Sequence, residues 1–485
     1  MPALSRRGLL AALPLLTLAP RAFAAPLPGG DVTGRALVAA LNGESDVQAF
    51  LAAHASPAGQ ARAARWTETL QRLRAASGGA DYVGSFDGGP GEALVRIRTR
   101  RQKVVRDLLV RPDRDAPERL YDLIAVPRPL PYAGEVPAKP LSRPALRAAL
   151  ARRVEAAVAQ DAFSGVVRVV APDGAVVYEA AHGLANRDDG VRLTPDSRLH
   201  LGSADKSFTA LIVGGLIEQG KLTFDTRLID VLPDYPNAEA ARAITVRHLL
   251  SHSAGLGTLW DRPLYDGRKP YRRVAELLPV FAAEPLLYAP GSRAAYSNEG
   301  FVVLGAAIEA VTGTDWWTQL DQRIYHPVGM VRSGHFTLDQ TVPGRAVGYR
   351  YPPEDLLGLG ERQPNWGFLG WRGNSCGGGY STVADMTAYL RALRAGKIVS
   401  PAMAETLTGR NTGGLANYGL GFTHRTVGGR TLRGHGGGGP TSGIEGDTQI
   451  VWETGWAYSI LGNYDAPFVT AISRDIATML AAQDA

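Results

Sequence analysis

The sequence predicts an α+β protein made of two folded domains, and three observations support this. The chain has 485 residues, 45% of them hydrophobic, which is more than one hydrophobic core normally organises. A segment with helical patterning is followed by four strand-like segments and then by a run of prolines. Beyond the prolines, a strand pair leads into an apolar helix. We therefore expect a small α+β domain over 25–126, a proline-rich linker over 127–144 and a larger domain over 145–485.

The first 24 residues have the features of an export signal. Arg6 and Arg7 precede a short apolar stretch, and Ala22-Phe23-Ala24 supplies a small-residue cleavage site. Paired arginines are typical of twin-arginine export, and an ordinary secretory signal that contains two arginines is an equal alternative. We expect a periplasmic or secreted protein whose mature chain begins near Ala25, without a stable membrane anchor.

Charge and cysteine content exclude several classes of function. The chain carries 52 basic and 46 acidic residues, a net charge of +6. Three of the arginines lie in the signal, which contains no acid, so 49 basic residues and a charge of +3 remain. That charge is too small to predict binding to nucleic acid. Cys376 is the only cysteine, so it predicts neither an intramolecular disulfide nor a cysteine metal cluster.

Two histidines have the spacing of metal ligands on a helix. His248 and His252 are four residues apart, but no glutamate lies between them. We predict no metal and no cofactor.

The N-terminal domain can be assigned from its periodicity. The helices-then-strands order predicts a small α+β unit, with a weak similarity to nuclear-transport-factor-2-like domains. No set of residues in it suggests catalysis, so covering the active site, binding a partner and mediating dimerisation are all open roles. Helical patterning covers Thr33–His54 and Ala61–Ala76, and strand patterning in meander order covers Tyr82–Phe86, Ala93–Thr99, Lys103–Val110 and Leu120–Val126.

The larger domain begins with a helix and a β-hairpin. An apolar stripe runs from Leu146 to Val158 at helical spacing. Phe163–Val170 and Ala175–Glu179 then flank a turn at Pro172-Asp173-Gly174. A second apolar helix follows from Phe208 and stops at Gly220.

Ser203-Ala204-Asp205-Lys206 stands at the start of this second helix. The spacing puts the serine hydroxyl and the lysine amine one turn apart, so that the amine can take the hydroxyl proton. The positive end of the helix dipole stabilises an alkoxide and favours an uncharged lysine. A lone motif of this kind is usually solvated surface, but the buried helix after a sheet favours Ser203 as a nucleophile with Lys206 as its base.

Two further motifs follow downstream. Tyr296-Ser297-Asn298 comes after a turn and before an apolar helix that begins near Gly300. His435-Gly436-Gly437 lies in a glycine run ahead of a strand over Thr448–Trp452. Taken alone, these would be a loop tyrosine with a capping asparagine and a loop histidine.

With the three motifs in this order, the chain resembles the penicillin-recognising serine hydrolases related to class C β-lactamases, a family that also contains D-amino-acid peptidases and esterases. The similarity runs from about Leu146 to the C-terminus and includes Leu201-Gly202-Ser203, Thr245–Leu256 and Tyr418–Phe422. It implies the β-lactamase/transpeptidase-like fold, in which helices flank an antiparallel sheet and an all-helical subdomain is added.

The resemblance also implies roles for the motif residues. Tyr296 shuttles protons to the leaving group, while the backbone amides of Ser203 and Gly438 form an oxyanion hole. Substrate contacts are expected from Asn298, His435 and Gly437.

One departure from the family pattern bears on the substrate. Many relatives carry lysine where this chain has His435, and a histidine that is mostly neutral near pH 7 attracts a carboxylate less strongly. Arg433 is a possible replacement for that charge. We therefore expect a covalent acyl-enzyme hydrolase of an ester or a D-residue-containing peptide or amide, with a small-molecule or peptide substrate. A β-lactamase and a penicillin-binding or sensor-like protein without turnover are the alternatives, and the oligomeric state stays open.

A second serine motif competes with Ser203. Gly373-Asn374-Ser375-Cys376-Gly377 matches the G-x-S-x-G nucleophile elbow of α/β-hydrolases. The H-G-G-G motif that would serve it comes after the elbow instead of before it, and glycines interrupt the strand the elbow needs. We expect a loop beside the active site here, and two aromatic-rich loops, Leu259–Tyr271 with Trp260 and Tyr349–Gly373 with Trp366 and Trp371, to face the substrate or simply to pack.

Overall fold

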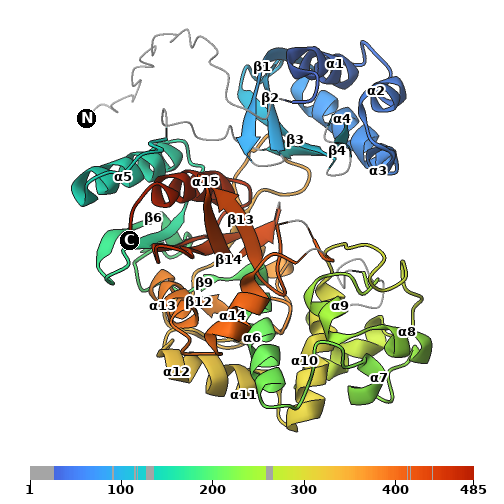
Figure 1. Cartoon of the computed structure of the whole chain (residues 1–485). Helices are drawn as coiled ribbons and strands as arrows, with labels where there is room; N and C mark the ends of the chain where they lie inside the picture. The colour runs from blue at the N-terminus through green and yellow to red at the C-terminus, as the bar shows by residue number, and fades with distance from the viewer. Residues whose placement is uncertain are drawn as a thin grey trace, which may run out of the picture.

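The computed structural model describes residues 27–89, 92–113, 116, 118–126, 136–257, 266–411, 413–415, 417–439 and 441–485. The predicted signal at 1–24, half of the proline-rich linker and Trp260 lie outside the described residues. Figure 1 shows the described chain as a small N-terminal lobe above a larger lobe. Among the described helices, none has the length and apolar character needed to cross a membrane.

The N-terminal domain packs helices against one face of an antiparallel meander. Sheet order β1-β2-β3-β4 confirms the predicted strand sequence. One helix prediction is wrong, because Thr33–His54 forms two helices. Gly43 ends the first with a φ of 71°, and the Asp46 side chain caps the second by accepting from the Ala49 amide. The elements are α1 (Gly30–Asn42), α2 (Val47–His54), α3 (Pro57–Gln60), α4 (Ala63–Ser77), β1 (Ala80–Gly89), β2 (Glu92–Thr99), β3 (Val105–Pro112) and β4 (Leu120–Val126).

The two faces of this small sheet bury their side chains in different cores. Val95 and Val110 pack with Trp66 and the other apolar residues of the N-terminal helices. Leu94 and Leu109 point the opposite way, as strand alternation requires, and belong to the core of the larger domain. The sheet therefore joins the two domains through buried apolar surface.

The larger domain is built on a six-stranded antiparallel sheet in the order β13-β14-β15-β16-β5-β6. Helices α5 and α15 pack on one face, and α13 packs on the other (Figure 1). An antiparallel sheet of this kind is not the parallel sheet of an α/β-hydrolase. The bounds are α5 (Arg143–Ala159), β5 (Gly165–Val170), β6 (Val176–His182), α13 (Val383–Arg394), β13 (Thr423–Val427), β14 (Arg430–Gly439), β15 (Ile444–Val451), β16 (Ala457–Gly462) and α15 (Phe468–Ala481).

The segment between β6 and α13 carries a group of helices beside the sheet, together with short strands. Its central helix, α6, buries residues on all sides, including Phe208 and Ile212. The helices are η1 (Gly202–Ala204), α6 (Asp205–Glu218), α7 (Leu228–Val231), α8 (Ala238–Ala243), α9 (Val246–Leu250), η3 (Val274–Val280), α10 (Asn298–Thr312), α11 (Trp316–Leu320), η4 (Asp321–Tyr325), α12 (His326–Val328) and η5 (Asn365–Gly367), with α14 (Pro401–Thr408) after α13; the short strands are β7 (Leu184–Asn186), β8 (Val191–Arg192), β9 (Leu199–His200), β10 (Tyr349–Arg350), β11 (Gln363–Pro364) and β12 (Tyr380–Ser381).

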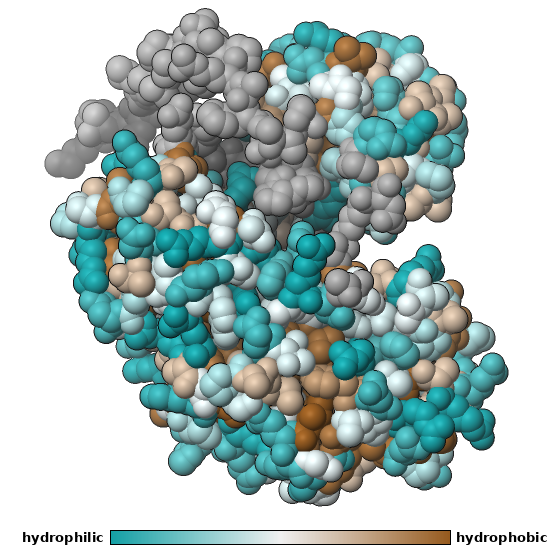
Figure 2. Space-filling view, viewed as in Figure 1, coloured by the Kyte–Doolittle hydropathy of each residue, from teal (hydrophilic) through white to brown (hydrophobic). Residues whose placement is uncertain are grey.

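A loop of the larger domain reaches into the N-terminal domain. β10 pairs with β11, and the chain between them carries Leu357 into the core of the N-terminal domain. The Arg106 Nε donates to the Leu357 carbonyl at 2.6 Å. Away from this contact the two lobes are separate, and a notch lies between them at the right of Figure 2.

Candidate active site

The predicted nucleophile lies where a turn of 3-10 helix enters the buried helix α6. Ser203 is in η1, and Lys206 is one turn further on, within α6. Ser203 is partly exposed, while Lys206 has no exposed surface. Among the described residues, Ser203 Oγ has no hydrogen-bond partner, and catalytic hydrogen bonds often tighten only when substrate is bound.

The backbone of the nucleophile packs directly on the glycine run of β14. A side chain added at Gly437 would place its Cβ 2.4 Å from the Ser203 amide nitrogen. One added at Gly202, where φ is +55°, would come within 2.4 Å of the Gly438 nitrogen. Only glycine tolerates this approach, which brings the two predicted oxyanion donors, Ser203 and Gly438, to the same corner of the site.

The lysine amine is held by two neutral acceptors. Lys206 Nζ donates to Asn298 Oδ1 at 2.8 Å and to the Cys376 carbonyl. No ion pair within 4.0 Å joins it to a carboxylate of the described chain. These two bonds use two N–H donors of the amine and hold it in one position.

The predicted proton shuttle lies at the rim of the site. Tyr296 is 43% exposed, and its ring centroid is 4.9 Å from Lys206 Nζ. Its other neighbour is His252, which stacks on it at 4.5 Å between centroids. His252 Nδ1 accepts from the Ser297 amide at 3.0 Å, which fixes the ring under the tyrosine. Burial, and then the nearby Lys206, lowers the pKa of His252 well below its ordinary value, so it stays neutral.

The glycine-run histidine belongs to the same group of rings. His435 lies in strand β14, not in a loop, and its Nε2 accepts from the Tyr418 hydroxyl at 2.9 Å. Its Nδ1 donates to the Gly436 carbonyl. Burial, followed by Lys206, lowers the pKa of His435 to about 4. His435 is therefore uncharged near neutral pH.

A cavity of about 310 Å³ opens over the nucleophile. Ser203, Tyr296, Asn298 and Gly438 line it. Within the described part of its lining, Lys206, His435 and Gly437 are absent, so these three residues do not border the cavity directly. The substrate contacts predicted for His435 and Gly437 stay predictions.

Arg433 does not supply a charge to this cavity. Its guanidinium forms two hydrogen bonds to Glu405, of 2.6 and 2.9 Å, and a third to Thr408. It also lies 4.4 Å above the Trp452 ring. The sequence leaves open whether Arg433 replaces the missing lysine; it does not, because Glu405 pairs with it and Arg433 is not among the described lining residues of the cavity.

The competing serine is buried in the loop next to Lys206. Ser375 has no exposed surface, and its carbonyl accepts from Thr209 Oγ1 at 2.8 Å. The neighbouring Asn374, Cys376 and Gly377 line the cavity, as expected of a loop beside the active site. Burial raises the pKa of the Cys376 thiol, and the role of this residue in the site is its backbone carbonyl.

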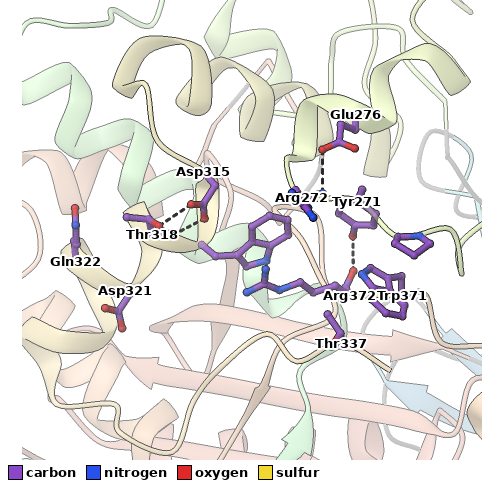
Figure 3. A pocket seen from close by; sticks show the side chains of 12 residues that line it. Tyr271, Arg272, Glu276, Asp315, Thr318, Asp321, Gln322, Thr337, Trp371 and Arg372 are labelled. Atoms are coloured by element: carbon purple, nitrogen blue, oxygen red, sulfur yellow. Dashed lines mark hydrogen bonds between the residues drawn. The ribbon is translucent and has the colours of Figure 1, made fainter. Parts of the chain in front are cut away.

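The far wall of the cavity is mostly apolar. Phe368 and Leu369 from the predicted aromatic loop line it, whereas Trp366 is a partly exposed neighbour. A second, outer cavity of about 830 Å³ lies between Tyr271, Asp315 and Trp371, as Figure 3 shows. Arg372 lines both cavities.

The comparison with known families identifies the family of this chain. Residues 150–483, more than half of the chain, match the family described as Beta-lactamase. The chain belongs to the β-lactamase family. Its fold is the β-lactamase/transpeptidase-like fold, and the solved penicillin-binding protein of Bacillus halodurans shares it at 25% identity and a TM-score of 0.58, over 67% of this chain and 97% of that one.

Curated relatives in this family have several activities in their names. Penicillin-binding protein 4 of Amycolatopsis lactamdurans is 32% identical over 47% of this chain and 58% of its own. Esterase EstB of Burkholderia gladioli is 32% identical over 38% and 51%. A D-aminopeptidase of Brucella anthropi is 28% identical over 56% and 51%. The chain thus spans about half the length of the curated relatives it matches.

Sequence reasoning missed several residues that shape the site. The spacing of His248 and His252 and the family segment Thr245–Leu256 gave no sign that His252 stacks on Tyr296, and no group of three or more metal-ligating side chains occurs in the described chain. Tyr418 was noted only as part of a family segment. The far-wall residues Phe336 and Arg345 carry no motif, and only the tertiary structure brings them to the cavity.

Proposed function

We propose that this protein is a serine hydrolase that forms a covalent acyl-enzyme on Ser203 and cleaves an ester or a D-residue-containing peptide or amide. The observation that carries the proposal is the buried amine of Lys206. It is bonded to two neutral acceptors, and Lys206 lies one helical turn after Ser203, whose backbone packs against Gly437 and Gly438.

In the acylation step, Lys206 Nζ accepts the Ser203 proton while Oγ bonds to the substrate carbonyl carbon. The carbonyl oxygen takes up the negative charge and accepts from the amides of Ser203 and Gly438. One such donor is typically worth about 2.7–4 kcal/mol of barrier lowering. When the tetrahedral intermediate collapses, the alcohol or amine leaves and takes a proton from the Tyr296 hydroxyl. Lys206 then returns a proton to Tyr296.

In the deacylation step, water attacks the acyl carbon and gives its proton to the same base. Ser203 Oγ leaves with a proton, and the acid is released. Asn298 holds Lys206 through its Oδ1 and lines the cavity, so it aligns the base and borders the substrate.

Hydrolysis of 4-nitrophenyl butyrate tests this proposal. Wild type should show a steady state, and Ser203→Ala should abolish it. Ser375→Ala is the matched control, because it removes a buried hydroxyl from the competing motif and should leave the rate unchanged. Activity that survives in Ser203→Ala, or that is lost only in Ser375→Ala, would contradict the proposal.

A neutral His435 supports ranking ester and D-peptide hydrolysis above β-lactam hydrolysis, since no cation stands at the lysine position of many relatives. Turnover of a chromogenic cephalosporin faster than of the ester would reverse that order. One acylation event without turnover on any ester would favour a penicillin-binding or sensor protein.

We also propose that the protein is exported, on the pattern of residues 1–24 and the bacterial relatives. Fractionation of a Gram-negative host should find the processed chain in the periplasm. A mutant host without twin-arginine transport distinguishes the two export routes.

A further inference from the structure

The far wall of the catalytic cavity carries a cation among apolar side chains. Arg345 lines the cavity together with the apolar residues Phe336, Leu338, Phe368 and Leu369. Its guanidinium carbon lies 5.8 Å from the Tyr380 ring centroid and 6.0 Å from that of Trp366.

The backbone fixes Arg345 close to the nucleophile. Arg198 donates its amide to the Gly344 carbonyl at 2.7 Å, and Ala346 donates to the Arg198 carbonyl at 2.9 Å. Arg198 directly precedes β9, the strand that leads into Ser203. The position of Arg345 is therefore set by the same segment that positions the nucleophile.

The Arg345 charge has no acidic partner in the described chain. Arg345 Nη1 donates to the Thr337 carbonyl at 3.2 Å, and no carboxylate of the described residues lies within 4.0 Å of its guanidinium nitrogens. A carboxylate is the ligand that matches the planar fork of a guanidinium.

The second arginine of the lining directs its charge elsewhere. The Arg372 Nε donates to the His335 carbonyl at 2.9 Å, and its guanidinium lies 4.0 Å from the Trp317 ring centroid. In Figure 3 the Arg372 side chain extends into the outer cavity, whose lining includes Asp315. Arg345 is thus the cation that belongs to the catalytic cavity.

The contacts of Tyr380 and Tyr296 indicate which part of the substrate lies near Arg345. His200 accepts from the Gly202 amide at 3.0 Å, its ring lies 4.9 Å from Tyr380, and Tyr380 neighbours Arg345. Tyr296, in contrast, stacks on His252, and its ring centroid lies 4.9 Å from Lys206 Nζ. If Tyr296 protonates the leaving group, the acyl group extends toward Tyr380 and Arg345.

We propose that Arg345 binds a carboxylate on the acyl group of the substrate, so that the enzyme prefers acyl chains that end in an anion. This rests on the proposed function of Ser203 and names the substrate class for it. Arg345 lines the cavity, whereas His435, at the strand β14 position where many relatives carry lysine, is not among its described lining residues.

Two esters with the same leaving group test this preference. Mono-4-nitrophenyl adipate and 4-nitrophenyl hexanoate have six-carbon acyl chains that differ at the far end, a carboxylate in one and a methyl group in the other. Wild type should hydrolyse the adipate with the higher kcat/KM. Arg345→Gln should lower kcat/KM for the adipate about 10- to 100-fold and change the hexanoate less than about threefold.

Two further variants control for charge and fold. Arg345→Lys keeps a cation and should recover part of the adipate preference. Arg332→Gln removes a surface arginine that pairs with Asp196 and should leave both esters unchanged. Equal losses on both esters in Arg345→Gln, or a wild-type preference for the hexanoate, would overturn the proposal.

Binding measurements test the anion site independently of the proposed hydrolysis. If wild type turns over neither ester, the hydrolase proposal fails, and affinity for both esters is measured by calorimetry on Ser203→Ala and on Ser203→Ala with Arg345→Gln. Tighter adipate binding that disappears with Arg345→Gln would support the anion site alone. Equal affinities would overturn it.

Discussion

The two walls of the catalytic cavity are built in different ways. The proton-handling wall is lined by Tyr296 and backed by Lys206, His252, Tyr418 and His435, and most of these side chains are buried and bonded to each other or to the backbone. The acyl wall comes from the chain between α12 and β12, and its Phe368 side chain is 46% exposed. The difference indicates that the first wall determines the reaction and the second determines which acyl groups fit.

The largest expected effect is at the base. Lys206→Met keeps the length of the buried side chain and removes the amine, so kcat/KM should fall by about 10²- to 10⁴-fold. Because the amine serves every acyl group, the loss should be equal for the hexanoate and adipate esters. A loss confined to one ester would break the division between the walls.

A smaller effect is expected at Tyr296, and it should depend on the leaving group. Nitrophenolate leaves without a proton, whereas methoxide needs one. Tyr296→Phe should therefore slow methyl hexanoate by about 10²-fold and 4-nitrophenyl hexanoate by less than tenfold. Titration of released acid follows the first substrate and absorbance the second. Equal losses would remove Tyr296 from proton transfer and leave it a packing role.

The acyl wall should control chain length. Phe368 lines the cavity and is 46% exposed, so Phe368→Ala removes apolar surface from the acyl path without disturbing Lys206. The ratio of kcat/KM for the hexanoate ester to kcat/KM for the acetate ester should fall about three- to tenfold in Phe368→Ala. The reason is that each buried methylene contributes roughly 0.8 kcal/mol, and part of that burial is lost. Phe86→Ala, at an exposed phenylalanine of the N-terminal domain, is the control and should change neither ester.

The smallest effect concerns stability. The pKa of His435 is lowered to about 4 in the folded protein. Between about pH 6.5 and 4, this histidine is therefore protonated in the unfolded chain but mostly unprotonated in the folded chain. The stabilisation from this residue is complete above pH 6.5 and is lost as the pH falls toward 4. The difference in unfolding free energy between wild type and His435→Gln should shrink over that interval, by at most about 1.4 kcal/mol per pH unit. A difference that does not change with pH would mean that His435 titrates normally in the folded protein.

Sequence motifs identify residues of the proton-handling wall but not those of the acyl wall. Ser203 and Lys206 are set by local helix geometry, and Tyr296 and Asn298 stand at the start of α10, so short motifs were enough to find them. Phe368 falls in the loop Tyr349–Gly373, which the sequence predicts to face the substrate or to pack. Phe336 and Arg345 lie in irregular chain without a period, and only contacts between distant segments bring them to the cavity.

The fold shows a similar limit. The meander and the hairpin follow from strand alternation, and the sheet contacts confirm them. The break at Gly43 was missed because apolar spacing continues on both sides of it. The insertion of Leu357 into the N-terminal core has no local signal, since it depends on where the two domains meet.

The covalent bond to Ser203 is tested most directly by intact-protein mass spectrometry. Wild type quenched in acid during turnover of 4-nitrophenyl hexanoate should gain the mass of one hexanoyl group, which peptide mapping should place on Ser203. Ser375→Ala should gain the same group, and Ser203→Ala should gain none. A hexanoyl group on another residue, or steady turnover without any covalent adduct in wild type and without loss of rate in Ser203→Ala, would contradict the acyl-enzyme mechanism.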